Sequence, residues 1–421
     1  MRRRLVASLI AASSCWLQAQ SPPVTAAANE ERAALQESLG EVGSSQIDFI
    51  RALEKHLLKY PKSEQRPDLE RALLKAAMEI KDQRRTLLYG EKALTSDPSN
   101  LEVLERVSRY LLVGDDRALA KRALEYAKRL EAVLRPMDNP QPGKNEARYQ
   151  EEKRIVLGKS LVYQARATGN LGDLAAADSL ARKSYEEFPS AESAREIARW
   201  LDKQGKTAEA ITYLADGFMI PDPNSVDEDR VRDRVRLGEW NKKLKGSEAG
   251  LGDAILAAYD RSRGRVEAFR LALKKLDPNA DAKQPMEYVI SGLNGEKLKL
   301  STLLGKVVVF DFWATWCGPC RAQQPLYDEV KARFKDDPNV VFLNVSTDEN
   351  RDIVKPFLDS NKWKKTVYFE DGLSALLRVT SIPMTMIVNR RGEIASRMNG
   401  YVPEKFVETM TARIREALAE K

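Results

Sequence analysis

The feature that most constrains the fold of this chain is a pair of cysteines, Cys317 and Cys320, directly after the apolar run 307–313 (Val-Val-Val-Phe-Asp-Phe-Trp). Gly318 and Pro319 separate the two cysteines. Proline fits the first turn of a helix because its missing N–H is not needed there. The pattern therefore predicts a buried strand that turns sharply into a helix, with a dithiol at the helix N-terminus.

The rest of the sequence decides among the roles that a Cys-x-x-Cys pair can have. A structural zinc site needs four cysteine or histidine ligands. The chain has only one other cysteine, Cys15, and a single histidine, His56, far away in sequence. A disulfide across two intervening residues closes a very short loop and gains little stability from the unfolded state. We therefore expect no metal and no cofactor, and a redox-active disulfide between Cys317 and Cys320.

Residues 1–22 have the pattern of an export signal, with three arginines followed by the apolar run 5–17, which is too short to span a bilayer. Two processing sites are possible. Cleavage could follow Ala19, or the Ala-Ser-Ser-Cys box at 12–15 could direct a lipid to Cys15. We expect an exported, periplasmic or extracytoplasmic chain that attaches to a membrane only if Cys15 is lipidated.

At 421 residues the chain should hold at least two domains, and its residue pattern changes near residue 280. Residues 23–280 have helical periodicity, whereas residues 281–421 alternate β-branched runs with helical ones, and the turn-rich segment 277–281 separates them. The formal charge of +7 includes +3 from the first arginines, which leaves about +4 after processing. Without a basic stripe interleaved with aromatics, we expect no nucleic-acid binding.

Small residues recur in the helical region at a spacing close to that of a 34-residue period. Three copies are visible: Gly114, Ala120 and Ala127; Gly172, Ala177 and Ser184; and Gly205, Ala210 and Gly217. Small residues at these points let antiparallel helices approach closely, and the arrangement resembles the tetratricopeptide repeat. The resemblance implies a short solenoid of three to four degenerate repeats that docks a protein partner. A nonrepetitive helical bundle is the alternative.

The second half predicts an α/β domain, beginning with a hairpin over 288–300 that turns at Asn294-Gly295. The further strands are expected at 307–312, 340–345, 366–369, 385–388 and 393–398, and the helices at 317–334, 352–361, 373–377 and 403–419. Strands that alternate with helices imply a sheet with parallel members covered on both faces.

Residues 284–421 resemble a thioredoxin-fold domain, and more narrowly the extracytoplasmic TlpA/ResA group of thiol-disulfide oxidoreductases. The motifs are Trp-Cys-Gly-Pro-Cys-Arg at 316–321, Pro325 five residues after the second cysteine, and Ile382-Pro383 at the position of the family's cis-proline. The leading hairpin also matches this group. The predicted fold class is therefore multidomain, an all-α repeat solenoid followed by a thioredoxin-like domain.

The resemblance and the chemistry of the residues together assign roles at this site. Cys317 at a helix N-terminus should have a lowered thiol pKa and act as the nucleophile, with Cys320 as the resolving thiol. Asp311 aligns with the buried aspartate of thioredoxins, and burial should raise its pKa so that it exchanges a proton with Cys320. Gln323 stands where many TlpA/ResA proteins have a glutamate, which moves the acid-base work to Asp311.

Trp316, Ile382 and Pro383 are expected to bind substrate, with the Ile382 backbone pairing with an extended segment. The implied partners are disulfide-bearing proteins and a membrane or periplasmic electron donor, in work such as cytochrome c assembly. The rival reading is an interaction protein whose thioredoxin fold docks or senses redox state with little turnover. A peroxiredoxin is a third reading, disfavoured because that family's reactive cysteine does not normally sit in a Cys-x-x-Cys.

Overall fold

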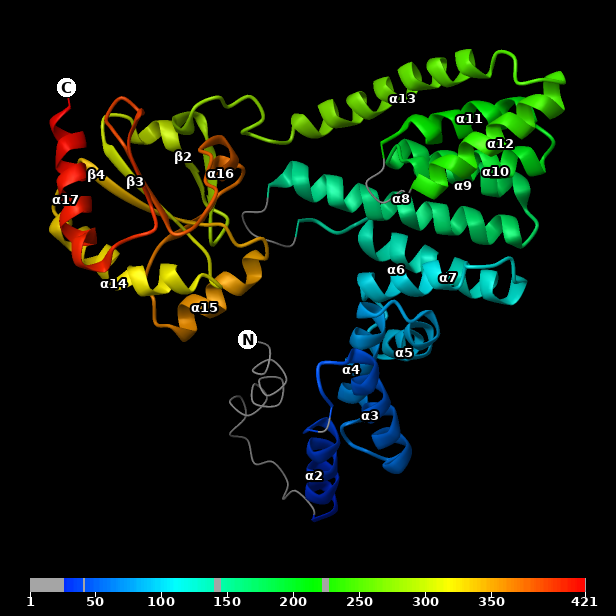
Figure 1. Cartoon of the computed structure of the whole chain (residues 1–421), viewed down its shortest axis with the longest axis horizontal. Coiled ribbons are helices and arrows are strands. Elements are labelled where there is room, and N and C mark those ends of the chain that lie inside the picture. Colours follow the sequence, from blue (N-terminus) through cyan, green and yellow to red (C-terminus); the bar gives the residue numbers. More distant parts are fainter. Residues whose placement is uncertain (1–25, 41, 140–144, 222–226, 421) are drawn as a thin grey trace. The chain divides into compact units, whose positions relative to one another are not determined.

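The computed structural model describes residues 26–40, 42–139, 145–221 and 227–420 of the chain. The residues divide into two compact units, Met1–Leu130 and Glu131–Lys421 (Figure 1). The predicted export signal and Cys15 lie outside the described residues. Within the described ranges, none of the helices combines the length and the apolar character that a membrane crossing requires.

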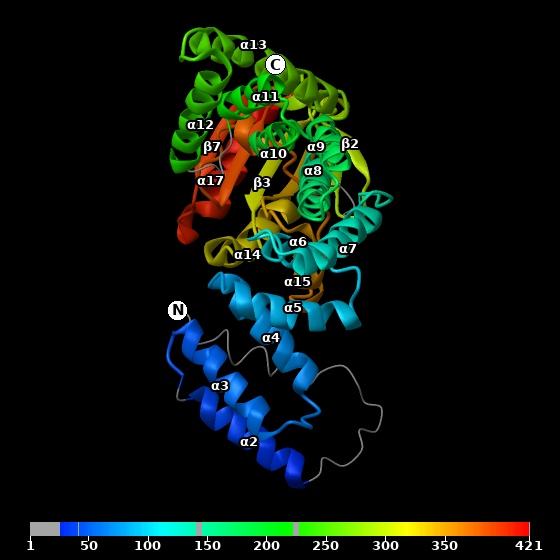
Figure 2. The ribbon, with the colours of Figure 1, turned by 90° about the vertical axis from the view of Figure 1, so that its right-hand side faces the viewer.

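In the described residues of the first unit, the regular elements are all helices. Its helices are α2 (Ala26–Gly40), α3 (Gln46–Lys59), α4 (Arg66–Glu79), α5 (Gln83–Ser96), α6 (Leu101–Tyr110) and most of α7 (Arg117–Leu134). Ser45, Asp82 and Asn100 cap α3, α5 and α6 by accepting a bond from a backbone N–H of the first turn. Successive helices from α2 to α6 pack against each other (Figure 2). His56 is buried in α3 and bonds Glu31 of α2 at 3.2 Å, which makes it a packing residue.

The second unit begins with further helices. They are α8 (Glu146–Asn170), α9 (Leu174–Glu187), α10 (Ala191–Lys203), α11 (Thr207–Met219), α12 (Asp227–Lys245) and α13 (Leu251–Lys274). The pairs α8/α9 and α10/α11 pack most extensively, and α9 also packs on α10. The predicted order, helices first and an α/β fold after them, is thereby confirmed for the described residues, while the domain bounds and the assignment to the tetratricopeptide repeat stay predictions.

The small residues inside the helices of the predicted copies lie where these helices meet, whereas Gly114, Gly172 and Gly205, which precede the helices, are exposed with open space around them. Ala177, Ser184, Ala210 and Gly217 are buried, and the hydroxyl of Ser184 donates to the Gly158 carbonyl at 2.8 Å. Side chains this small let neighbouring helix backbones come close. The pattern therefore located helix contacts at its second and third positions, and not at the glycine that opens each copy.

The region from 285 onward is a thioredoxin-like α/β fold with a seven-stranded mixed sheet in the order β2-β1-β5-β4-β3-β6-β7. The strands are β1 (Val289–Gly292), β2 (Lys297–Lys299), β3 (Val307–Trp313), β4 (Val340–Ser346), β5 (Val367–Phe369), β6 (Met384–Val388) and β7 (Ile394–Asn399). The α-helices are α14 (Gly318–Arg333), α15 (Val354–Ser360), α16 (Leu373–Leu376) and α17 (Pro403–Ala419). Strands β3, β4 and β5 are parallel and the other pairs are antiparallel.

The two faces of this sheet are covered by different helices, as predicted. Val307 and Val309 of β3 pack with residues of α14 and α17, whereas Val308 and Phe310 pack with residues of α16. Side chains alternate between the faces of a strand, so Asp311 lies on the face that α14 covers. The sheet thus carries a carboxyl into the layer beneath the helix that begins at the cysteines.

Candidate active site

Cys317 and Cys320 form a disulfide at the N-terminus of α14. Cys317 is the N-cap residue, and its sulfur accepts a bond from the Cys320 amide at 3.1 Å. The two cysteines are 3% and 6% exposed, so burial does not distinguish nucleophile from resolving thiol. Their positions differ, because Cys317 caps α14, where unpaired N–H groups would stabilise a thiolate, and Cys320 lies within the first turn.

Apolar side chains surround the disulfide on its inner side. The cysteines share a cluster with Trp313 of β3 and Leu358 of α15, and Ile382 packs against this cluster. The Ile382–Pro383 peptide bond is cis, as predicted. Trp316 projects outward with 69% of its surface exposed. The three residues predicted to bind substrate therefore comprise an exposed indole, a half-buried isoleucine and a buried proline.

Asp311 is buried beneath α14. Its Oδ1 accepts a bond from Gln323 Nε2 at 3.5 Å, and Gln323 lies one helical turn after Cys320 on the same side of α14. Burial raises the pKa of Asp311 from 3.8 to about 6, an effect that Lys365 opposes and Asp328 reinforces. A carboxyl with this pKa can accept or release a proton near neutral pH.

A cation that the sequence reasoning missed lies near this carboxyl. Burial lowers the pKa of Lys365 to about 8, while the charges of Asp311 and Asp328 act to raise it. The Lys365 ammonium stands 3.6 Å from the centroid of the Trp313 ring and donates to Gln324 Oε1 at 2.8 Å. In the sequence Lys365 belongs to a Lys-Lys pair before a short strand, which is typical of a solvated loop.

The loop before the cysteines is held by a second carboxylate that the sequence reasoning also missed. Asp348, which follows β4, is buried and accepts bonds from the amide and the hydroxyl of Thr315 at 3.0 and 2.7 Å. Ser346 donates to the same carboxylate at 2.9 Å. These bonds fix the segment that leads into Cys317, whose amide bonds the Ala314 carbonyl at 3.1 Å.

Known proteins are similar in sequence to the thioredoxin-like part of this chain. A family described as thioredoxin-like matches residues 305–394. The thioredoxin-like protein YneN of Bacillus subtilis is 30% identical over 130 residues, which cover 30% of this chain and 76% of YneN. The chain belongs to the thioredoxin-like family.

Further relatives of this thioredoxin-like chain are similar over the same share of it. The thiol-disulfide oxidoreductase ResA of Halalkalibacterium halodurans is 28% identical over 134 residues, which cover 31% of this chain and 76% of ResA. A solved structure of a secreted Mycobacterium tuberculosis disulfide oxidoreductase homologous to E. coli DsbE is 22% identical, with 31% of this chain and 97% of that chain covered and a TM-score of 0.28. The predicted likeness to ResA-type proteins is confirmed.

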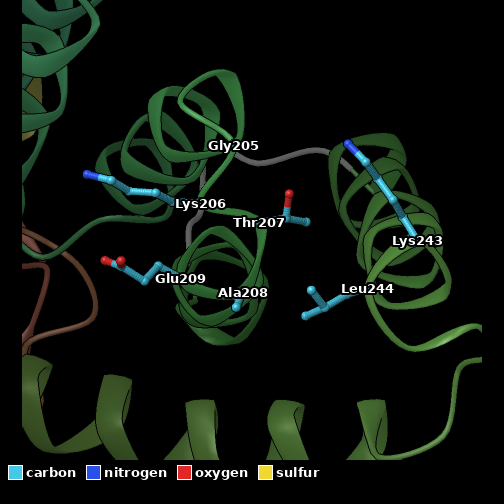
Figure 3. A pocket seen from close by; sticks show the side chains of 7 residues that line it. All are labelled: Gly205, Lys206, Thr207, Ala208, Glu209, Lys243 and Leu244. Atoms are coloured by element: carbon cyan, nitrogen blue, oxygen red, sulfur yellow. The ribbon is translucent and has the colours of Figure 1, made fainter.

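A pocket elsewhere in this thioredoxin-like chain offers no comparable chemistry. It lies where α11 begins and α12 ends, with Thr207, Glu209 and Lys243 among its lining residues (Figure 3). Thr207 is buried and donates to Asp202 at 3.3 Å. The lining residues include no cysteine or histidine. Among the described residues, no group of histidine, cysteine, aspartate and glutamate side chains could hold a metal ion, so the disulfide of α14 is the candidate site.

Proposed function

We propose that the chain is an exported thiol-disulfide oxidoreductase that reduces, or exchanges, disulfides in partner proteins. The single observation that carries this proposal is the Cys317–Cys320 disulfide at the start of α14, above the buried carboxyl of Asp311. The likeness to the thiol-disulfide oxidoreductase ResA supports it. The proposed reaction starts from the reduced dithiol.

In the first step the Cys317 thiolate attacks one sulfur of a substrate disulfide. A mixed disulfide between Cys317 and the substrate forms, and the other substrate sulfur leaves as a thiolate. The N-terminus of α14 favours the attacking anion. Exposed Trp316 and the chain at Ile382–Pro383 border the cysteines and would hold the substrate segment.

In the second step the Cys320 sulfur attacks Cys317 Sγ of the mixed disulfide. The Cys320 proton goes to the Asp311 carboxylate, the Cys317–Cys320 disulfide forms, and the second substrate thiolate leaves. The substrate has gained two electrons and the protein has lost two. An electron donor in the membrane or periplasm must then reduce the disulfide back to the dithiol. Such a donor is needed because the compartment to which the chain is exported is oxidising and would otherwise keep the cysteines as a disulfide.

Reduction of insulin disulfides by the full chain, with dithiothreitol as the electron source, tests the activity. We expect turnover above the dithiothreitol background and its loss in Cys317→Ser. Absence of turnover at every dithiol concentration would instead favour an interaction protein in which the thioredoxin-like fold docks a partner or senses redox state.

The division of labour between the cysteines is tested by trapping. Cys320→Ser should accumulate mixed disulfides between substrate and Cys317, because the resolving attack is removed. The matched Cys317→Ser variant should trap little. Greater trapping through Cys320 would reverse the assignment.

Asp311→Asn tests the proton acceptor. The second step should slow at pH 7 while the circular dichroism spectrum is unchanged, because asparagine keeps the shape and loses the base. Equal rates for wild type and Asp311→Asn at every pH from 6 to 8 would exclude this role for Asp311.

Export and docking complete the proposal. N-terminal sequencing of the mature protein should begin at Gln20, or mass spectrometry should find a lipid on Cys15; a chain that retains Met1 would contradict export.

The helical repeats would dock the partner. A photo-crosslinking residue in place of exposed Leu88 or Val113 should capture that partner more than one in place of exposed Leu304 in the thioredoxin-like region.

A further inference from the structure

The side chain of Lys365 is unusually placed for a lysine. Residue 365 precedes β5, and its ammonium stands between two indoles, 3.6 Å from the Trp313 ring centroid and 4.6 Å from that of Trp363. Trp313 is 1% exposed. An ammonium group is strongly hydrated, so a site of this kind needs compensation for the water it excludes.

Three kinds of compensation are present. The negative faces of the two indoles attract a cation. Gln324 accepts a hydrogen bond from Lys365 Nζ at 2.8 Å, and Gln324 Nε2 in turn donates to Asp328 Oδ1 at 2.9 Å. The third is the field of the Asp311 carboxyl. Among the described residues no carboxylate oxygen lies within 4.0 Å of this ammonium, so Asp311 and Lys365 interact through space and not as a contact ion pair.

We propose that Lys365 is a positioning residue for disulfide exchange, whose caged ammonium holds Asp311 ionised at neutral pH and thereby ready to take the Cys320 proton. This inference rests on the role given to Asp311 in the proposed function and adds the group that keeps that carboxyl charged. Lys365 itself forms and breaks no bond in the reaction. The two indoles and Gln324 fix where its charge stands.

The groups around Asp311 leave Lys365 as the cation that acts on it. Strand β3 pairs Asp311 with Asn344 of β4 and Thr385 of β6, and neither side chain carries a charge. Helix α17 presents apolar residues to this face of the sheet. Helix α14 carries Cys320, Arg321, Tyr327, Asp328, Glu329, Lys331 and Arg333. Of these, Tyr327, Asp328 and Lys331 interact electrostatically with Asp311 or Lys365.

The direction of the effect follows from charge. Burial and Asp328 raise the pKa of Asp311 and the charge of Lys365 lowers it, so loss of the ammonium must raise that pKa further. Asp311 has a pKa of about 6 and Lys365 of about 8, which leaves both groups charged in the interval between them. In this interval the carboxylate can accept the Cys320 proton and pass it to solvent after the substrate leaves.

The test compares Lys365→Met with Lys365→Arg and Lys364→Met in the full oxidised chain. Methionine keeps the apolar stem and removes the charge, arginine keeps the charge, and Lys364 is an exposed neighbouring lysine. The titration of Asp311 is followed by carbon-13 NMR of its carboxyl, assigned by its loss in Asp311→Asn. We expect the midpoint to move up by roughly one pH unit in Lys365→Met, and to stay in place in the other two.

The second readout is the pH profile of the resolving step in the reduced chain. Its midpoint should move up with that of the carboxyl in Lys365→Met, and Lys365→Arg should restore it. An unchanged Asp311 midpoint in a folded Lys365→Met chain would overturn the inference; if that variant does not fold, Lys365→Gln supplies the same comparison. A wild-type chain without turnover would defeat the proposed function, while the NMR titration would still decide the role of Lys365.

Discussion

Replacement of Asp311 by asparagine should increase the free energy of unfolding relative to wild type, and this increase should be larger at high pH than at low pH. Burial raises the pKa of Asp311 from 3.8 to about 6 in the folded chain. A carboxyl whose folded pKa is raised stabilises the fold below its unfolded pKa, and that stability is lost as the pH rises through about 6. Asparagine cannot titrate and therefore removes this pH dependence.

The magnitude follows from the shift. About two pH units at 1.36 kcal/mol each give a cost of about 3 kcal/mol for the buried carboxylate at pH 8. At pH 4 the folded chain keeps the proton and the unfolded chain holds about half of it, so the cost is roughly 0.5 kcal/mol. The difference between Asp311→Asn and wild type in the free energy of unfolding should change by about 2.5 kcal/mol between pH 4 and pH 8.

Urea unfolding of the oxidised chain at both pH values measures this change. If the chain unfolds in more than one transition, the transition of the thioredoxin-like region is identified by its midpoint, which should shift when dithiothreitol reduces the Cys317–Cys320 disulfide. Asp336→Asn is the matched control, because the Asp336 carboxylate is 89% exposed and its replacement should show no such change. If Asp311→Asn alters the free energy of unfolding equally at pH 4 and pH 8, the burial argument for Asp311 is wrong.

Four further substitutions test other parts of the structure. Gly169→Ala should lower the free energy of unfolding by about 1–3 kcal/mol, because the new Cβ would lie 2.2 Å from the buried Trp200 ring, whereas Gly264→Ala has open space and should stabilise α13 by up to about 1 kcal/mol; urea titrations compare them. Trp316→Ala should raise the KM for a protein substrate and leave the melting temperature unchanged, because its side chain is exposed. Asp348→Ala should cost about 1–3 kcal/mol in urea unfolding, since it strips buried N–H and O–H groups of their acceptor; a loss below 0.5 kcal/mol would contradict this.

Much of the thioredoxin-like fold could be predicted because its signals are local. The run 307–313 became a fully buried strand, and the helix predicted at 403–419 has those bounds in the structure. Asn294-Gly295 turns the first hairpin with a positive φ of 86° at Gly295, as its turn chemistry requires. The helix predicted at 352–361 instead begins as a 3-10 turn, Arg351–Ile353, and continues as α15.

The polar surroundings of the cysteines could not be predicted in the same way. Lys365 and Asp348 come from segments 48 and 31 residues beyond Cys317 in sequence, and each reaches the site only because β4 lies beside β3 and β5 lies beside β4 in the sheet. A lysine next to another lysine, and an aspartate in Ser-Thr-Asp-Glu-Asn, both have the local pattern of exposed loops. The order of the strands in the sheet brings such residues to the site, and the local sequence pattern does not reveal that order.

Gln323 shows why one carboxyl, and not two, suits this site. Its amide nitrogen donates to Asp311 Oδ1 at 3.5 Å. A glutamate at position 323 would therefore place a second carboxylate next to that of Asp311, where Lys365 is the cation that opposes the rise of the Asp311 pKa. Two carboxylates this close cannot both ionise without a large cost, and one would keep its proton well above neutral pH. A neutral amide at 323 instead leaves a single carboxyl under the influence of a single cation. The departure from glutamate and the caged lysine are therefore two parts of one arrangement, which lets Asp311 ionise below neutral pH while buried.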